Sequence, residues 1–277
     1  MTDLAADIKS MKLYSHIDRV LNELAEIGKD GDAPLSAEEL SAFDQLHYHG
    51  TDAVDRAIEM IGIDRDTRVL EIGSGFGGPA RHIAHNTRAQ VTALELQPDQ
   101  DRLAATLTAR CGLSSHLAHV CGDALAHDWR GQAFDAIVSW LTLYHIADRD
   151  RLLAICAGLL PVGGAVYAED LFGRRAFDAA ERAELASGLY AGHLPDFDSY
   201  QAEFARAGFA IAHAEDLSDD WTRFTTERLR AYRADRARHV RVHGAPTFDA
   251  LESFYDLVNR HFRSGKLGGI RLLARKA

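Results

Sequence analysis

Residues 69–84, VLEIGSGFGGPARHIA, decide the fold of this chain, because an apolar strand runs into a glycine-rich turn that opens onto a helix. The glycines permit a tight turn and let a ligand approach the backbone closely. The helix that follows has free N–H groups at its N-terminus, which favours a nucleotide-type ligand. The stretch also satisfies G-x-G-x-x-G through Gly73, Gly75 and Gly78, so a dinucleotide site stays open at this point.

The alternation of strand and helix continues to residue 170. Short apolar segments are separated by segments with helical patterns, which predicts right-handed βαβ units and a parallel sheet covered on both faces. We expect five strands here: RVLEIG at 68–73, QVTALEL at 90–96, LAHVCGDAL at 117–125, FDAIVSW at 134–140 and GGAVYAED at 163–170.

Helical patterns flank this region on both sides. Before it, LYSHIDRVLNELAEIG at 13–28 carries one apolar stripe, and a second helical stretch is interrupted by FDQLHYHG at 43–50. After it, we expect helices over 173–206, a strand at GFAIAHAEDL, an arginine-rich helix over 221–243 and a last strand at GGIRLLARK. The predicted parts are an N-terminal helical lid at 1–62, a Rossmann-like ligand-binding core at 63–172, and substrate-cap helices with the last two strands at 173–277.

Composition and charge restrict the class of protein. The 277 residues include 31 basic and 41 acidic ones, and a formal charge of −10 disfavours nucleic acid as a partner. We find neither a secretory leader pattern nor an apolar run of the membrane-spanning length of about 18 residues, so a cytoplasmic protein that does not enter a membrane is expected. Three cysteines without CxxC spacing, and histidine pairs without an obvious third ligand, predict no metal site.

Acidic residues lie at the ends of successive predicted strands. Glu95 ends the second strand and can accept hydrogen bonds from both hydroxyls of a ribose. Asp123 ends the third strand in the same crevice and can accept from the exocyclic amine of an adenine, while Ala124 offers its backbone N–H to the ring. Glu71 precedes the glycines, where it either orders the loop or faces an ammonium group of the ligand.

Five successive segments resemble the motifs of class I S-adenosylmethionine-dependent methyltransferases, in order and at the usual spacing. They are VLEIGSGFGG, ALEL, GDAL, FDAIVSWLTLYHI and LLPVGGAVYAED, and the match spans residues 45–172. LLPVGG resembles the Leu-Lys-Pro-Gly-Gly signature of this family, with Val162 inserted, and the dinucleotide dehydrogenases have no such element.

The resemblance implies the fold, the cofactor and the residues that bind it. The implied fold is doubly wound α/β, with a seven-stranded sheet of six parallel strands and a final antiparallel one. The implied cofactor is S-adenosylmethionine, with S-adenosylhomocysteine as its product and no metal. The glycines then pass close to the methionine part, Glu95 binds the ribose, and the remaining candidates surround the cofactor. The full set is Glu71, Gly73, Ser74, Gly75, Gly77, Glu95, Leu96, Asp123, Ala124, Trp140 and Leu141.

Within the family, the chain is most similar to the sarcosine and dimethylglycine N-methyltransferases of the glycine betaine pathway. The segments that carry this similarity are FDQLHYHG, GSGFGGPARHIA, WLTLYHIADRDRLL, SYQAEFARAGFAI and DLSDDWTRFTTERLRAYR. Leu141, Thr142 and Leu143 stand where that branch often has Gln-Asp-Ala. The similarity implies a small-molecule methyl acceptor, which we expect to be the nitrogen of an amino acid or small amine. Sulfur of a thioether or thiol is the alternative, followed by oxygen or carbon.

The chemistry of methyl transfer suggests the catalytic candidates. It is an in-line displacement that requires an aligned lone pair and exclusion of water, and a protonated acceptor must first lose its proton. Histidine and carboxylate side chains suit that task. We expect His49, Tyr48, His145 and Asp170 to contribute, with Glu169 beside Asp170 pointing the other way because neighbours on a strand alternate.

Several features have alternative interpretations. The aromatic residues Tyr14, Tyr48, Tyr144, Trp140 and Trp221 either pack in the core or line a cage for a methylated ammonium. The arginines within residues 223–241 either form a solvated or intersubunit helix or bind an acidic partner, and one of them could clamp a substrate carboxylate. The N-terminal helical extension favours a homodimer. A non-catalytic cofactor-binding protein is the alternative from another class, which the intact glycine, Glu95 and Asp123 set disfavours.

Overall fold

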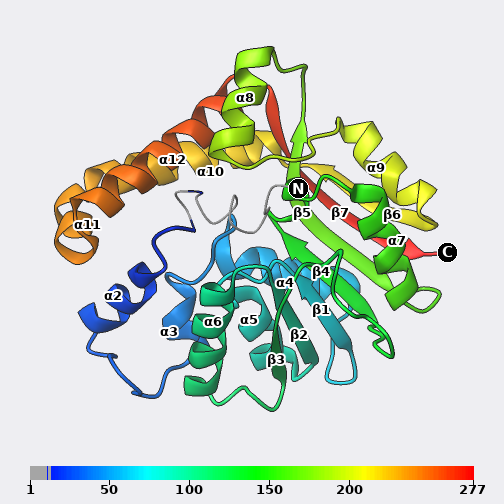
Figure 1. Cartoon of the computed structure of the whole chain (residues 1–277), viewed down its shortest axis with the longest axis horizontal. Coiled ribbons are helices and arrows are strands. Elements are labelled where there is room, and N and C mark those ends of the chain that lie inside the picture. Colours follow the sequence, from blue (N-terminus) through cyan, green and yellow to red (C-terminus); the bar gives the residue numbers. More distant parts are fainter. Residues whose placement is uncertain (1–10, 12–13) are drawn as a thin grey trace.

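The computed structural model describes Met11 and residues 14–277, and its central element is a sheet in the order β3-β2-β1-β4-β5-β7-β6 (Figure 1). Strands β1 to β5 are parallel, and β7 runs antiparallel to both β5 and β6. The prediction of a doubly wound, mostly parallel seven-stranded sheet is therefore confirmed. The strands are β1 Arg68–Ile72, β2 Gln90–Glu95, β3 Leu117–Cys121, β4 Ala136–Trp140, β5 Ala165–Gly173, β6 Phe209–Asp216 and β7 Leu267–Lys276.

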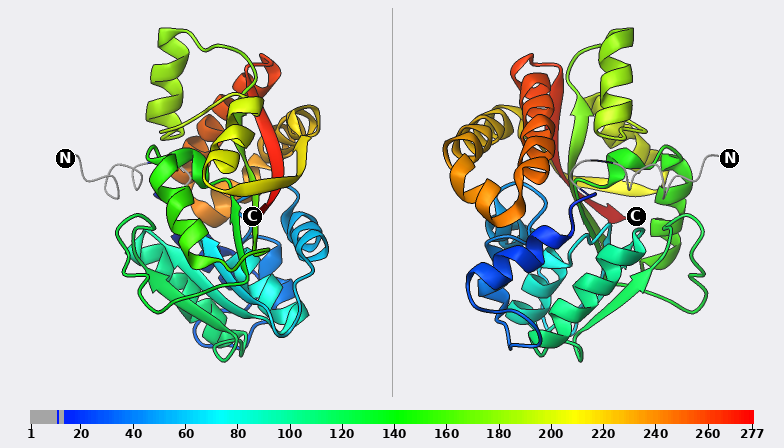
Figure 2. Two further views of the ribbon diagram at one scale, coloured as in Figure 1. Left: turned by 90° about the vertical axis from the view of Figure 1, so that its right-hand side faces the viewer. Right: turned by 60° about the vertical axis from the view of Figure 1, so that its left-hand side comes forward.

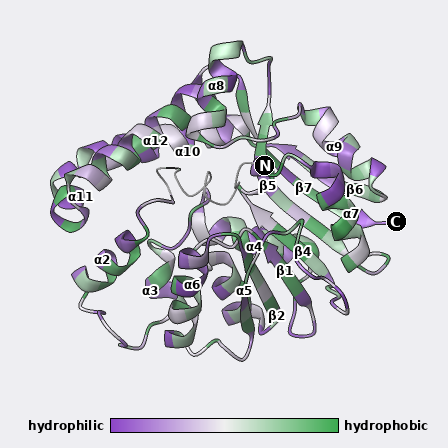
Figure 3. Ribbon diagram, viewed as in Figure 1, coloured by the Kyte–Doolittle hydropathy of each residue, from purple (hydrophilic) through white to green (hydrophobic). Residues whose placement is uncertain are grey.

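Helices cover both faces of this sheet, as the two views of Figure 2 show. Helices α4 (Gly50–Ile61) and α5 (Gly78–Thr87) pack on one face through small residues such as Ala53, Ala57 and Ala80. Helices α7 (Arg149–Leu159) and α9 (Phe197–Arg206) pack on the other. Figure 3 shows hydrophobic residues concentrated on the strands and hydrophilic ones on the surrounding helices. Burial of both sheet faces explains the near-continuous apolar runs of the strands.

Of the remaining helices, α6 (Pro98–Arg110) packs against β2 and β3, α3 (Ala37–Ser41) packs against α5, and the others lie around the carboxyl edge of the sheet and beyond it. The short turn η1 (Leu143–His145) follows β4, and α8 (Ala179–Gly188) precedes α9. Three helices are inserted between β6 and β7, and Figure 1 shows them reaching across to the N-terminal helix α2. The bounds of the others are α2 Asp18–Glu26, α10 Ser218–Ala234, α11 Arg236–His243 and α12 Ala245–Arg263.

The helices of the structure differ from the predictions in three places. The expected helix over 221–243 is divided at Asp235, whose backbone leaves the helical region at φ −100° and ψ 28°. A further helix, α12, follows Gly244 and was not predicted, although its buried residues repeat with helical spacing. The apolar stripe at 13–28 becomes helix only from Asp18, and Leu13, like residues 1–10, lies outside the described residues. The predicted division at 62 and 172 stays a prediction.

Ion pairs within the chain fasten α11 to α2. Arg238 binds both carboxylate oxygens of Glu23, at 3.0 and 2.5 Å, and Arg241 binds both oxygens of Glu26, at 2.8 and 2.6 Å. His243 also contacts Glu23, at 2.9 Å. The arginine-rich helix therefore connects the cap to the N-terminal segment. No helix among the described residues is long and apolar enough to cross a membrane.

Candidate functional site

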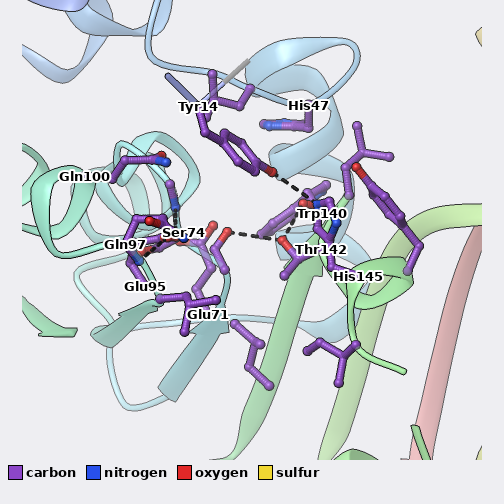
Figure 4. A pocket seen from close by; sticks show the side chains of 18 of the residues that line it. Tyr14, His47, Glu71, Ser74, Glu95, Gln97, Gln100, Trp140, Thr142 and His145 are labelled. Carbon is purple, nitrogen blue, oxygen red and sulfur yellow. Dashed lines mark hydrogen bonds between the residues drawn. The ribbon is translucent and has the colours of Figure 1, made fainter. Parts of the chain in front are cut away.

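A cavity of about 320 Å³ lies along the carboxyl ends of strands β1 to β5. The reversal of strand order between β1 and β4 separates the loops that follow these strands, which is where ligands bind in open α/β sheets. Figure 4 shows Glu71, Ser74, Glu95 and Gln97 on one side of this pocket, with Trp140, Thr142 and His145 on the other. The N-terminal segment and the cap complete the wall with Tyr14, Asp44, Leu46, His47, Tyr48, Leu189, Arg228, Phe254 and Val258.

The glycine-rich turn forms the floor of the cavity. Gly73 and Gly75 line it with φ angles of 77° and 54°, in the left-handed region that favours glycine. A Cβ atom on Gly73 would lie 2.2 Å from the side chain of Thr142, so glycine is also required for space. Ser74 lines the cavity too, and its buried hydroxyl has no hydrogen-bond partner among the described residues. The turn thus presents backbone and one unpaired hydroxyl to a ligand.

Gly77, also expected to contact the cofactor, does not line the cavity. It is the N-cap residue before helix α5, with φ 74°, and a Cβ atom there would lie 2.9 Å from Nη1 of Arg81. That arginine is buried, forms an ion pair of 2.9 Å with buried Asp44, and donates to the carbonyl of Phe76. Gly77 therefore makes room for the arginine that ties the N-terminal loop to the glycine-rich turn.

Glu95 occupies the position expected for a ribose-binding acid. It ends β2, is 7% exposed, and accepts backbone N–H bonds of 2.8 Å from both Gly75 and Gln97. These two bonds fix its carboxylate at the edge of the cavity and leave each oxygen a further lone pair for a ligand hydroxyl. Burial raises the pKa of Glu95, and its two backbone bonds oppose that rise.

Glu71 is a buried acid on the wall of the cavity. Its side chain is 1% exposed, and its Oε2 atom has no hydrogen-bond partner among the described residues. Burial raises the pKa of Glu71 to about 8, although the charge of Arg81 opposes the rise. A buried carboxyl group with an unpaired oxygen favours a cationic ligand group next to it.

The other cofactor candidates also line the cavity. Asp123 follows β3, and its Oδ1 accepts from the Leu125 N–H at 2.8 Å. Leu141 has a left-handed backbone, with φ 50°, and its N–H donates to the Glu169 carbonyl. The buried indole N–H of Trp140 has no acceptor among the described residues. Leu96, Ala124, Trp140 and Leu141 all lie on the cavity wall.

A tyrosine and a histidine meet over the opposite wall. The Tyr14 hydroxyl lies 3.4 Å from Nε2 of His145, and Nδ1 of the same ring lies 3.0 Å from the carbonyl oxygen of Tyr190. A carbonyl can only accept, so Nδ1 carries the proton and Nε2 accepts from Tyr14. Burial lowers the pKa of His145 to about 4, so the ring is neutral near pH 7.

The structure places two of the four catalytic candidates outside the cavity. His49 has a left-handed backbone and directs its ring to Asp220, with Nε2 and Oδ2 2.6 Å apart. Asp170 is fully buried, where it accepts from the Tyr200 hydroxyl at 3.0 Å and lies 3.5 Å from Arg149. Its neighbour on β5, Glu169, points to the other face of the sheet and contacts Arg271 at 2.8 Å. Neither of these two acids therefore lines the cavity.

Tyr48 and His145 do line the cavity, with neighbours that the sequence did not reveal. The ring of Tyr48 meets Trp221 edge to face at a centroid distance of 4.6 Å. Trp221 itself is buried behind it and does not line the cavity, so it lies outside the suggested aromatic cage.

Two further residues, His47 and Thr142, line the cavity although the sequence did not predict them there. The ring of His47 lies 5.6 Å from that of Trp140. In the described part of the chain, no group of three metal-ligating side chains is present.

Comparisons with known proteins agree with this geometry. Residues 70–168 match the family described as a methyltransferase domain. A glycine/sarcosine/dimethylglycine N-methyltransferase of Actinopolyspora halophila is 30% identical over 171 residues, which cover 60% of this chain and 29% of that protein. A sterol 24-C-methyltransferase of Neurospora crassa is 30% identical over 165 residues, 57% of this chain and 44% of that protein. The chain thus spans less than half the length of these curated relatives.

A solved structure extends the comparison to the whole chain. It is a phosphoethanolamine N-methyltransferase 2 of Haemonchus contortus, in complex with phosphomonomethylethanolamine and S-adenosylhomocysteine. It covers 100% of this chain and 60% of its own, with a TM-score of 0.80 and 17% sequence identity. The protein is therefore a class I methyltransferase in fold, built around a methyltransferase domain. Its expected resemblance to the sarcosine and dimethylglycine N-methyltransferases is confirmed by the relative from Actinopolyspora halophila.

The cavity fits S-adenosylmethionine, the cofactor of this domain. The unpaired Oε2 of Glu71 can meet the ammonium group of the methionine part, and the Glu95 carboxylate can accept from the ribose hydroxyls. The turn presents Gly73, Ser74 and Gly75 to the cavity, and at Gly73 a Cβ atom would collide with the side chain of Thr142. Asp123 keeps one carboxylate oxygen available for an adenine amine.

Proposed function

We propose that the protein transfers the methyl group of S-adenosylmethionine to a nitrogen atom of an amino acid or small amine. The observation that carries this proposal is that one cavity contains both the glycine-rich turn with Glu95 and the hydrogen-bonded pair of Tyr14 and His145. The first part suits the cofactor. The second part is a hydrogen-bonded polar pair on the opposite wall, where an acceptor can be oriented.

The roles of the side chains follow from their hydrogen bonds. S-adenosylmethionine supplies an electrophilic methyl group when it is bound. The Tyr14 hydroxyl donates a hydrogen bond to His145, so the lone pairs of the Tyr14 oxygen can accept a hydrogen bond from an N–H of the methyl acceptor. That bond orients the nitrogen, and Tyr48, Leu189 and Phe254 exclude water around it.

This arrangement selects an uncharged nucleophile. A histidine with a pKa of about 4 is a weak base near pH 7, so it orients Tyr14 rather than removing a proton from an ammonium group. An amine therefore reacts in its neutral form, having lost its proton to solvent. A thioether has no proton to lose, and the same weakly basic wall favours a sulfur acceptor as the second candidate.

A screen with labelled cofactor tests the proposed reaction. The protein is incubated with S-adenosylmethionine carrying a ¹³C methyl group and, one at a time, amino acids, amines, thioethers and phenols. We expect release of S-adenosylhomocysteine, with the ¹³C label on nitrogen by NMR. Label on sulfur would replace the proposal by its second candidate. Bound cofactor without methyl transfer to any acceptor class would contradict catalysis and favour the non-catalytic alternative.

Other expectations stay predictions. They are the small-molecule acceptor as the partner, a homodimer, a cytoplasmic location, and the individual cofactor-binding and catalytic roles of the residues named above.

A further inference from the structure

Arg228 reaches the cavity from helix α10 in the cap. It is one of the wall residues, together with the apolar side chains of Leu189, Phe254 and Val258. Its guanidinium carbon lies 4.4 Å from the ring centroid of Tyr255 and 4.9 Å from that of Tyr48. The aromatic rings fix the guanidinium group in position, so it is preorganised to bind a ligand.

Arg228 has no acidic partner among the described residues, unlike most of the neighbouring arginines. Five other arginines of α10 and α11 form ion pairs: Arg223 with Asp220, Arg230 with Glu227, Arg233 with Glu252 and Asp256, Arg238 with Glu23, and Arg241 with Glu26. Arg236 is exposed and lies over the ring of Phe248. Arg228 is only partly exposed, and its buried Nε has no hydrogen-bond acceptor in the described part of the chain.

A second arginine adds positive charge beside it. Arg19, at the start of α2, has a buried Nη2 without a hydrogen-bond partner in the described residues. Burial lowers the pKa of Arg19, and the nearby charge of Arg228 contributes to that lowering. Arg19 lies over the ring of Phe76 and is not a cavity wall residue, so it adds positive charge near Arg228 while Arg228 itself faces the ligand.

The acids of the cavity do not neutralise this charge. They are Asp44, Glu71, Glu95, Asp123 and Asp148, and none of them lies within ion-pair distance of Arg228. Asp44 is paired with Arg81, and Glu95 accepts from two backbone amides. The cap end of the cavity is thus cationic and aromatic, whereas the end at the glycine-rich turn is acidic.

We propose that Arg228 binds an anionic group, a carboxylate or a phosphate, of the methyl acceptor. The acceptor is then an amino acid or a phosphorylated amine rather than a simple amine, because its nucleophile meets Tyr14 while its anion meets the cap. The planar guanidinium group can bind either oxyanion through two parallel N–H bonds. This inference rests on the proposed methyl transfer, and it narrows the acceptor class for the same cavity.

The test compares acceptors that differ only in the anion. The pairs are glycine with methylamine, and phosphoethanolamine with ethanolamine, each assayed by release of S-adenosylhomocysteine. We expect the anionic member of at least one pair to react with a kcat/KM about 10- to 100-fold higher, the range of a charged hydrogen bond. The glycine and phosphoethanolamine arms distinguish a carboxylate from a phosphate. An advantage for the neutral member in both pairs would overturn the proposal.

Substitutions at Arg228 assign that preference to the residue. Arg228→Gln should lower the preference by about 10-fold or more, and Arg228→Lys should restore part of it. Arg230→Gln is the matched control, because Arg230 is exposed on the same helix and pairs with Glu227. Affinity for S-adenosylhomocysteine should be unchanged in all three variants. A weaker affinity in Arg228→Gln alone would show that the arginine binds the cofactor, which would overturn the proposal.

A binding measurement separates failure of this inference from failure of the proposed function. Acetate and inorganic phosphate are titrated into the wild-type protein and Arg228→Gln, each with S-adenosylhomocysteine present, and binding is followed by NMR. We expect one of the anions to bind the wild type about 10-fold more tightly than the variant. Equal binding would reject the role of Arg228 even if methyl transfer is observed. Conversely, a clear difference would support the anion site even if no acceptor is methylated.

Discussion

The hydroxyl of Tyr14 lies 3.4 Å from Nε2 of His145, and this contact joins the N-terminal segment to the turn that follows β4. The two residues are 131 positions apart in the sequence and meet over the cavity. Under the proposed function, this contact holds the N-terminal segment at the place where the acceptor is oriented. The contribution of this contact to methyl transfer can be measured without changing the glycine-rich turn and Glu95.

Removal of the Tyr14 hydroxyl should slow methyl transfer. Tyr14→Phe keeps the ring but loses the oxygen that orients the acceptor, so we expect kcat/KM to fall about 5- to 10-fold, the worth of one net hydrogen bond. Affinity for S-adenosylhomocysteine should stay within twofold. Tyr232→Phe is the control, because Tyr232 packs on Phe248 outside the cavity wall. An equal loss in both variants would speak against an orienting role for Tyr14.

The glycine at position 73 should be irreplaceable for two separable reasons. In Gly73→Ala, the alanine must adopt a left-handed backbone with φ 77°, which is strained for a residue with a side chain. Its Cβ atom would also lie 2.2 Å from the side chain of Thr142. We expect loss of cofactor binding in calorimetry together with reduced stability. Gly62→Ala shares the backbone conformation, with φ 81°, but has open space around its Cβ. That variant should lose about 1 kcal/mol of stability and bind cofactor normally. Normal binding by both would refute the steric argument.

The buried His145 should make the protein less stable in acid. Its pKa is about 4 in the folded chain and 6.5 as the ordinary value, so the unfolded chain binds the extra proton between these two pH values. Its contribution to stability is therefore complete above pH 6.5 and is lost as the pH falls toward 4, by up to about 1.4 kcal/mol per pH unit. The difference in unfolding free energy between wild type and His145→Phe should shrink over this range. A pH-independent difference would disprove burial of a neutral ring.

Cofactor binding should release a proton from Glu71. With a pKa of about 8, this carboxyl group is mostly protonated at pH 7, and a neighbouring ammonium group favours its charged form. We expect calorimetric titrations of S-adenosylhomocysteine, run in buffers of different ionisation enthalpy, to report release of up to about one proton. Glu71→Gln should abolish the release. Identical heats in all buffers for the wild type would place the ammonium group elsewhere.

The sequence was most informative where local chemistry defines the element. The sheet could be predicted because the alternation of apolar strands and helices is compatible with few topologies. The cofactor end of the cavity could be predicted because the glycine-rich turn follows β1 directly and Glu95 is the last residue of β2. The acceptor end depends on contacts between distant segments. His49 and Asp170 looked suitable as isolated residues, but the fold pairs them with Asp220 and with Tyr200 and Arg149. No local pattern specifies such partners.

Arg228 is a residue whose position in the site could not be predicted from the sequence. In the sequence it is one of seven arginines in a single helical stretch. The fold pairs five of the others with acids and brings Arg228 to the cavity wall. The sequence suggested that one of these arginines clamps a carboxylate. Which arginine does so could be inferred only from the packing of α10 against the N-terminal loop and α12. The helix α12 itself carried a readable apolar stripe.

Calorimetric titration of the wild-type protein and Glu95→Gln with S-adenosylhomocysteine tests the central claim, that the cavity beside the glycine-rich turn binds this cofactor, most directly. The wild type should bind one molecule per chain. Glu95→Gln should bind about 1–3 kcal/mol more weakly because the ribose loses a charged acceptor. Glu59→Gln, an exposed acid on α4 that pairs with Arg56, should behave as the wild type. Absence of binding to the wild type, or unchanged affinity in Glu95→Gln, would contradict the account.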